Sequence, residues 1–177
     1  MRAYYLDHDT GSNPRLPHER SPPAPLTEAE LNKFGILYWD CSGPDGQAKL
    51  ESVAKERGYR NRDEVRIAPG LLPDYEKKIK MFFDEHIHED EEIRFALEGS
   101  GYFDVRSQSD DWVRIRMEKG DLIVLPAGIY HRFTTDTRDY IHVVRLFTDA
   151  PKWEAINRPL ADSTAARAAY LQHTNAV

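Results

Sequence analysis

Six strand-length runs between residues 82 and 147 constrain the fold of this chain more than any other feature. They are rich in β-branched and aromatic residues and read EIRFALEG, GYFDVRS, WVRIRME, DLIVLP, YHRFTTD and IHVVRLF. Turn signals separate the runs: Gly99-Ser100-Gly101, Ser107–Asp111, Gly120-Asp121, Pro126-Ala127-Gly128 and Asp136–Asp139. Short strands at this spacing predict a small antiparallel β-barrel or jelly roll.

The sequence before these runs predicts helices and one extended stretch. Residues 11–25 contain five of the eleven prolines of the chain and should form an extended segment without a helix. Thr27 and Glu30 form a capping-box pattern at the start of a short helix. We expect two further helices, over residues 46–57 and 74–80.

The whole chain is expected to form a single domain over residues 1–177. Its length fits one core of ordinary size. Helices and the extended segment occupy 1–80, the barrel about 81–150, and a tail with Lys152-Trp153 and an Ala-rich helical stretch 151–177. The predicted class is mostly β with flanking helices (α+β).

Composition limits the partners of the protein. The formal charge is −6 and the isoelectric point is about 5.6, which argues against nucleic acid or an anionic membrane as a partner. No apolar run approaches ~18 residues, and the polar N-terminus does not resemble a secretory signal. A lone cysteine, Cys41, fits a reducing compartment. We therefore expect a cytoplasmic protein.

The segment FFDEHIHEDEEIRF, residues 82–95, combines two histidines with many carboxylates. Side chains alternate along a strand, so His86 and His88 share a face about 6.6 Å apart at the backbone. In a straight strand Glu92 would lie about 20 Å from His86. Because metal–ligand bonds are only ~2.0–2.2 Å long, the chain must bend at 89–91 for the three to bind one ion.

A second candidate ligand lies downstream, at His131. It follows Gly120, Pro126 and Gly128, which indicate a tight hairpin and a turn at the rim of the sheet. A lone strand-end histidine is more often a hydrogen-bonded structural residue, but the upstream pair makes a ligand the better interpretation. The other histidines are interpreted as structural (His142) or as solvent-exposed (His8, His18 and His173).

The two stretches resemble the two motifs of the cupin superfamily. The first motif, H-x-H-x₃-E-x₆-G, matches His86, His88, Glu92 and Gly99; the second, G-x₅-P-x-G-x₂-H, matches Gly120, Pro126, Gly128 and His131. Longer segments, from YEKKIKMFF to GSGYFDVR and MEKGDLIVLPAGIYHRF, are similar to the acireductone dioxygenase family in its eukaryotic form. Thr135 stands where cupins usually have asparagine, which removes no ligand.

The resemblance implies a metal-dependent dioxygenase of methionine salvage. The four matched side chains would bind one Fe²⁺ or Ni²⁺ per chain: His86, His88, Glu92 and His131. With iron, 1,2-dihydroxy-5-(methylthio)pent-1-en-3-one and O₂ give 4-methylthio-2-oxobutanoate and formate. With nickel, they give 3-(methylthio)propanoate, formate and carbon monoxide. The family also implies a monomer in the cytoplasm, with nuclear occurrence in eukaryotic members.

Further residues are candidates for substrate contacts. Arg94 shares the parity of Glu92 and matches an arginine with a substrate role in the family; the alternative is an exposed strand arginine. Arg145 lies among apolar residues and suits a pocket role or a buried salt bridge equally. Glu85 matches a proposed general base, although strand alternation directs it away from the metal. Three phenylalanines are candidates for the wall around the methylthio tail or for plain core: Phe82, Phe133 and Phe147.

Two other functions remain open at this point. The chain can be a different cupin metalloenzyme, such as a manganese or zinc isomerase or an oxidase, or a non-catalytic cupin that binds or stores a ligand. The four ligands do not choose between iron and nickel, because both accept imidazole and carboxylate. The Pro-rich segment 11–25 can dock a partner or simply wrap the surface.

Overall fold

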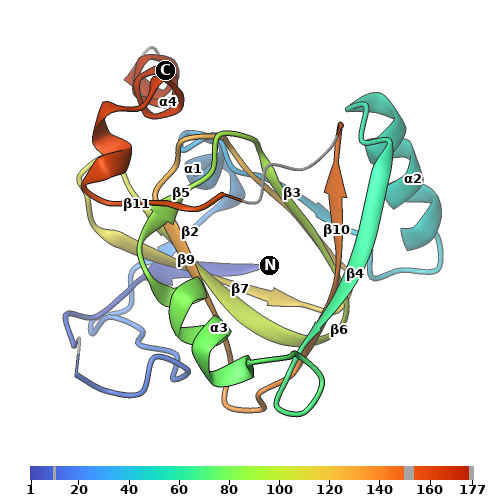
Figure 1. The fold of residues 1–177 in the computed structure, drawn as a ribbon, viewed down its shortest axis with the longest axis horizontal. Coiled ribbons are helices and arrows are strands. Elements are labelled where there is room, and N and C mark those ends of the chain that lie inside the picture. Colours follow the sequence, from blue (N-terminus) through green and yellow to red (C-terminus); the bar gives the residue numbers. More distant parts are fainter. Residues whose placement is uncertain (10, 150–153, 176–177) are drawn as a thin grey trace.

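The computed structural model describes residues 1–9, 11–149 and 154–175 (Figure 1). Its helices are α1 (Glu28–Asn32), α2 (Gly46–Glu56), α3 (Tyr75–Phe83), α4 (Ala165–Asn175) and the 3₁₀ turn η1 (Leu160–Ser163). Its strands are β1 (Arg2–Tyr5), β2 (Pro25–Leu26), β3 (Leu37–Asp40), β4 (Asn61–Ile67), β5 (His86–Ile87), β6 (Glu92–Arg106), β7 (Trp112–Glu118), β8 (Asp121–Leu125), β9 (His131–Thr135), β10 (Ile141–Phe147) and β11 (Ile156–Asn157).

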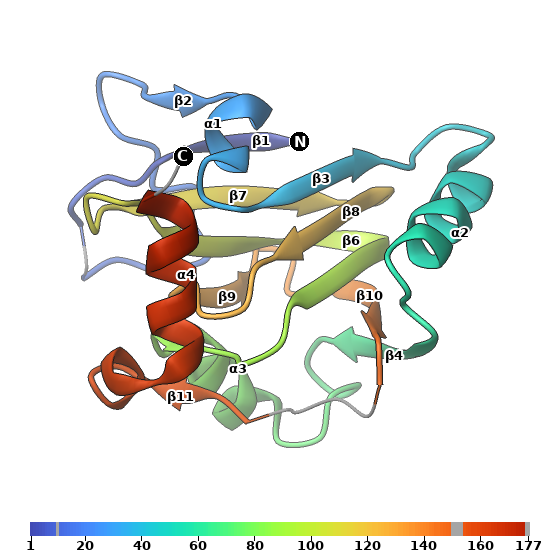
Figure 2. The ribbon, with the colours of Figure 1, turned by 90° about the horizontal axis from the view of Figure 1, so that it is seen from above.

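Two antiparallel sheets share the long strand β6. One sheet runs β11-β5-β9-β6-β7-β1-β2, and β6 also pairs with β8 and β10, which pair in turn with β3 and β4. The first half of β6 lies in the β8/β10 sheet, and its second half lies between β7 and β9. Figure 2 shows the resulting layers, with α2 on one side and α4 on the other. The predicted mostly β architecture with flanking helices is confirmed.

The continuity of β6 corrects one sequence prediction. Gly99-Ser100-Gly101 was expected to be a turn between two strands, but it lies inside β6. Gly99 has a φ of +73°, and a Cβ there would lie 2.2 Å from the carbonyl oxygen of Tyr140. The register of β10 against β6 shifts beside this point, between His142 and Val143. Glycine therefore permits a bulge that bends one strand from the first sheet into the second.

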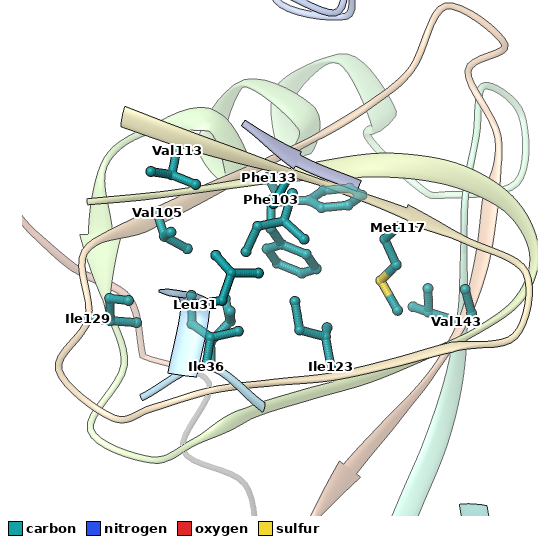
Figure 3. Packing of buried hydrophobic residues seen from close by; sticks show 14 of the residues in the cluster. Leu31, Ile36, Phe103, Val105, Val113, Met117, Ile123, Ile129, Phe133 and Val143 are labelled. Atoms are coloured by element: carbon teal, nitrogen blue, oxygen red, sulfur yellow. The ribbon is translucent and has the colours of Figure 1, made fainter. Parts of the chain in front are cut away.

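The main core lies between the two sheets. Figure 3 shows side chains from β6, β7, β9 and β10 meeting residues of α1 and of the segment after it. The rings of Phe103 and Phe133 lie 5.0 Å apart. A second cluster packs α2 against the outer face, through Leu50 and Val53 on the helix and Leu122 on β8. These two cores hold the barrel whose one end carries the site.

The helices follow the predicted ranges, with one extension. Thr27 and Glu30 form the expected capping box at α1. The third helix continues beyond the predicted residue 80, because α3 buries Tyr75 and Ile79 on one face and Phe82 packs against the same core. In the described part of the chain, no helix has the length and apolarity required to cross a bilayer.

Strands β1, β2, β4 and β11 were not predicted from the sequence. In β4 only Ile67 is buried, and the charged residues around it hide the alternation. Strand β1 is short and lies between β7 and the edge strand β2.

The Pro-rich segment lies against the barrel. The guanidinium of Arg114, which is fully buried, donates hydrogen bonds to the carbonyl oxygens of Pro14 and Leu16. The hydroxyl of Tyr4 donates to the carbonyl oxygen of Pro17. Residues 11–24 contain no helix, as predicted, and these contacts favour the interpretation of a surface wrap. The tail forms α4 as expected, whereas Lys152-Trp153 lies outside the described residues.

Candidate metal centre

Four potential ligands converge at one end of the barrel. His86 lies on β5, His88 follows that strand, Glu92 begins β6 and His131 begins β9. One ligand atom from each side chain lies within 4.8 Å of the others. The Glu92 Oε2 atom is 3.1 Å from Nε2 of His131 and 3.2 Å from Nε2 of His88. The chain bends at 89–90, as the metal interpretation required.

Backbone carbonyls orient all three imidazoles. The Nδ1 atom of His86 lies 2.6 Å from the carbonyl oxygen of Asp84. That of His131 lies 3.0 Å from the carbonyl oxygen of Ile129, and that of His88 lies 2.9 Å from that of Glu154. A carbonyl can only accept, so each neutral ring carries its proton on Nδ1. Each Nε2 lone pair is therefore available for a metal ion.

The electrostatic surroundings of the cluster favour protonation states that can bind a metal ion. Burial opposes ionisation of Glu92, but Arg94 at 3.1 Å and the adjacent imidazoles of His131 and His88 hold its pKa well below the usual range. Burial, with His131 close by, lowers the pKa of His86 to about 4. For His88, burial lowers the pKa, but the adjacent Glu92 carboxylate and the Glu154 carbonyl together outweigh burial and raise it. At neutral pH the cluster thus holds a carboxylate and at least one unprotonated imidazole.

The donor set fits a divalent transition metal. Three imidazole nitrogens and one carboxylate oxygen suit Fe²⁺, Ni²⁺ and Zn²⁺, whereas Mg²⁺ and Ca²⁺ prefer oxygen-only sites. The ligands His86, Glu92 and His131 are buried, and the exposed fraction of the His88 side chain is 18%. An ion held here would be largely enclosed by protein.

A cavity of about 400 Å³ opens onto the four ligands. Its charged lining consists of the ligands together with Lys78, Arg94 and Arg145. The rest is largely apolar: Val65, Ile67, Leu72, Met81, Phe82, Phe103, Phe133, Val143 and Ala155. The volume suits a small molecule with one polar end and one apolar end.

Comparison with known proteins decides the family. The model described as the ARD/ARD' family matches residues 2–155. The chain belongs to this acireductone dioxygenase family. It is 52% identical over 172 residues to "Acireductone dioxygenase" of Branchiostoma floridae, covering 97% of this chain and 96% of that protein. It is 49% identical over 174 residues to the protein of the same name from Rattus norvegicus, with the same coverage of 97% and 96%.

A solved structure shows the same fold. The structure described as "Acireductone dioxygenase from Bacillus anthracis with cadmium ion in active center" aligns with a TM-score of 0.69 and 21% identity. The alignment covers 88% of this chain and 98% of that chain. The predicted cupin fold and the resemblance to the acireductone dioxygenase family are therefore confirmed.

Arg94 and Arg145 both line the cavity, in different electrostatic settings. The two are opposite each other in the β6–β10 pairing. The guanidinium of Arg94 contacts Glu92 and donates to the carbonyl oxygen of Ile93, and burial lowers its pKa. Arg145 donates two hydrogen bonds to Asp63, of 2.7 and 2.6 Å. For Arg145, a pocket position and a salt bridge thus occur together.

The three phenylalanines separate into two groups. Phe82 and Phe133 line the metal cavity, and Phe133 also belongs to the main core. Phe147 instead lines a neighbouring cavity of about 310 Å³. The wall between the two cavities contains His88, Glu92 and Arg94, which line both. Phe147 is therefore near the ligands but on the other side of them.

The structure places Glu85 outside the cavity. Its carboxylate accepts hydrogen bonds from Arg106, at 2.8 and 3.1 Å, and from Arg158, at 3.1 Å. This is the orientation that alternation from His86 predicts, so the geometry gives Glu85 a role in an ion-pair network.

The histidines outside the cluster have other partners. Nε2 of His142 lies 2.9 Å from a carboxylate oxygen of Glu64, in line with a structural role. The expectation for His18 was wrong, because only 7% of its side chain is exposed. Its two ring nitrogens contact Asp7 and the carbonyl oxygen of Asn13. The polar residues around His18 in the sequence suggested exposure, but they fold around the ring and bind both of its nitrogens.

Sequence reasoning missed several residues of the cavity wall. Val65 and Ile67 come from the unpredicted strand β4, and Leu72 from the loop that follows it. Lys78 and Met81 come from α3, where they lie on the same face as Phe82. The prediction ended this helix at residue 80, so the shared face of residues 78, 81 and 82 was not recognised.

Proposed function

We propose that the protein is an acireductone dioxygenase that cleaves 1,2-dihydroxy-5-(methylthio)pent-1-en-3-one with O₂. With Fe²⁺ the products are 4-methylthio-2-oxobutanoate and formate. With Ni²⁺ they are 3-(methylthio)propanoate, formate and carbon monoxide. The observation that carries the proposal is the convergence of His86, His88, Glu92 and His131 beside a cavity of about 400 Å³.

The polar end of the cavity suits an enediolate. Arg94 keeps a largely buried positive charge next to the ligands, with 15% of its side chain exposed, because Glu92 at 3.1 Å balances that charge. Arg145 adds a second cation that Asp63 holds in place. A charge-assisted hydrogen bond from Arg94 to a substrate oxygen would orient the anion at the ligand cluster.

The apolar end suits the methylthio tail. Phe82 and Phe133 provide aromatic walls, with Val65, Ile67 and Leu72 opposite them. Burial of such a tail contributes about 25 cal/mol per Å² of apolar surface removed from water. A tail bound between these walls would displace water from the cavity. Electrostatic interactions at the ligand cluster would then be stronger, because less solvent screens them.

Four side chains would hold the metal, and the ion would serve as a Lewis acid and template for the substrate. We infer one ion per chain, iron or nickel, since the geometry offers a single cluster of this kind within the described residues. The chain would act as a monomer in the cytoplasm, and in the nucleus as well. Light scattering after size exclusion tests the monomer, and imaging of the tagged protein tests the location.

Anaerobic loading tests the function directly. Apo-protein loaded with Fe²⁺ or with Ni²⁺ is mixed with the acireductone and air-saturated buffer. We expect rapid loss of the enediol absorbance, uptake of O₂, and carbon monoxide only from the nickel form. Absence of O₂ uptake by the iron form above a metal-free control would contradict the proposal and favour another cupin activity.

A further inference from the structure

Lys78 is the one cation of the cavity without a partner in residues 1–9, 11–149 and 154–175. The guanidinium groups of Arg94 and Arg145 are paired with Glu92 and Asp63. No hydrogen bond or ion pair of the described residues involves the Lys78 ammonium. A lysine that lines a cavity without a carboxylate partner is available to an incoming anion.

Lys78 lies at the rim of the cavity, away from the ligands. The ligands His86, Glu92 and His131 are buried, whereas Met81, which lines the cavity from α3, is 53% exposed. Lys78 is half-buried and lies four residues, about 6 Å along the axis, before Phe82 on the same helix. Lys78 therefore contributes a positive charge to the α3 side of the cavity.

The two approaches to the ligands carry opposite charge. Lys78, Arg94 and Arg145 line the cavity beside α3. In the neighbouring cavity Arg94 is the one cation among the described lining residues, against five carboxylates: Glu89, Asp90, Glu91, Glu92 and Asp149. In a protein of net charge −6, a locally cationic approach attracts an anion that the net charge of the protein repels.

We infer that Lys78 is a substrate-capture residue that draws the anionic enediolate into the cavity beside α3. The inference rests on the proposed function, because a reductone ionises readily when its charge is shared with the adjacent carbonyl. The role of Lys78 is in binding rather than in the chemical step. Its charge should therefore affect kcat/KM and leave kcat nearly unchanged.

The experiment compares Lys78→Met with Lys78→Arg, Lys78→Glu and Lys80→Met. Methionine keeps an apolar stem of similar length, so it separates charge from packing. Lys80 lies on the opposite face of α3 and is exposed, which makes Lys80→Met the matched control. Metal content and thermal midpoint are measured first, and both should equal those of the wild type.

At low ionic strength, we expect Lys78→Met to lower kcat/KM about three- to tenfold and Lys78→Glu to lower it further. Lys78→Arg and Lys80→Met should match the wild type. The deficit should shrink to within about twofold near 0.5 M salt, where the Debye length is only a few ångströms. An unchanged kcat/KM in Lys78→Met, or a deficit that salt does not alter, overturns the inference.

A binding measurement keeps this result separate from the proposed function. L-ascorbate, a stable enediolate, is titrated into the nickel-loaded protein without O₂. Weaker binding to Lys78→Met than to Lys80→Met at low salt supports anion capture, even if the wild type fails to turn over the acireductone. Equal affinities overturn it. Turnover by the wild type is judged independently and decides the proposed function alone.

Discussion

The Nδ1 atom of His88 lies 2.9 Å from the backbone carbonyl oxygen of Glu154. A residue 66 positions later in the sequence therefore orients this metal ligand. The next residues extend this contact, because Ile156 and Asn157 of β11 pair with Ile87 and His86 of β5. The C-terminal segment is therefore part of the metal centre, although it supplies no ligand.

Loosening this segment should weaken metal binding. Ile156→Pro would disrupt the pairing of β11 with β5 and allow the Glu154 carbonyl to move away from His88. Loss of such an orienting contact typically costs 10- to 100-fold in metal affinity, so we expect about tenfold weaker Ni²⁺ binding by calorimetry. Leu160→Ala, at a side chain that is 74% exposed, serves as the control and should bind as the wild type does.

Arg94→Ala should separate substrate binding from metal binding. The variant keeps all four ligands, so metal content should remain near one ion per chain. Loss of a charge-assisted contact costs about 1.5–3 kcal/mol, and we therefore expect kcat/KM to fall roughly 10- to 150-fold. Arg62→Ala removes an exposed pair with Glu51 and is the control. Kinetics of Arg94→Ala equal to those of the control would assign Arg94 a purely structural role.

Burial of neutral His86 should make the metal-free protein sensitive to acid. Its pKa in the folded protein, about 4, is below the ordinary value of 6.5. The unfolded chain thus binds more protons between these values, and folding stability is retained above about pH 6.5 and lost as pH falls toward 4. In urea titrations across this range, His86→Gln should show a shallower fall in unfolding free energy than the wild type. Parallel curves would count against a neutral buried imidazole.

The ion pair of Arg114 with Asp104 should dominate local stability. Both groups are almost fully buried, and Asp104 also accepts a hydrogen bond from Arg132, next to His131. Asp104→Ala leaves a buried guanidinium without its counter-ion, which typically costs about 3–5 kcal/mol. Glu51→Ala breaks an exposed pair and should cost at most about 1 kcal/mol. Chemical denaturation of the two variants checks the contrast, and equal losses would refute it.

The ligand set was accessible from sequence because it depends on local geometry. Alternation places His86 and His88 on one face, and a polar corner returns Glu92 to the same place. Glycine and proline at the hairpin before His131 bring in the fourth ligand. Strand runs such as IHVVRLF were equally clear, since β10 spans Ile141–Phe147.

Other features depend on contacts that no local pattern encodes. The carbonyl of Glu154 belongs to the backbone, and 66 residues separate it from His88. In the sequence, Lys78 resembles one of several solvent-exposed lysines. In the structure it lines a cavity together with Val65 and Ile67 of β4. The bend of β6 at Gly99 resembled a turn, because glycine serves bulges and turns alike.

The central claim is that three imidazoles and one carboxylate bind a single transition-metal ion. The most direct measurement is the nickel content of the reconstituted protein, combined with X-ray absorption at the nickel edge, for the wild type, His88→Ala and His173→Ala. We predict one nickel per chain with three imidazole scatterers in the wild type and in His173→Ala, and a large loss of nickel and of turnover from a folded His88→Ala. Normal nickel content and an unchanged spectrum in His88→Ala would contradict the account.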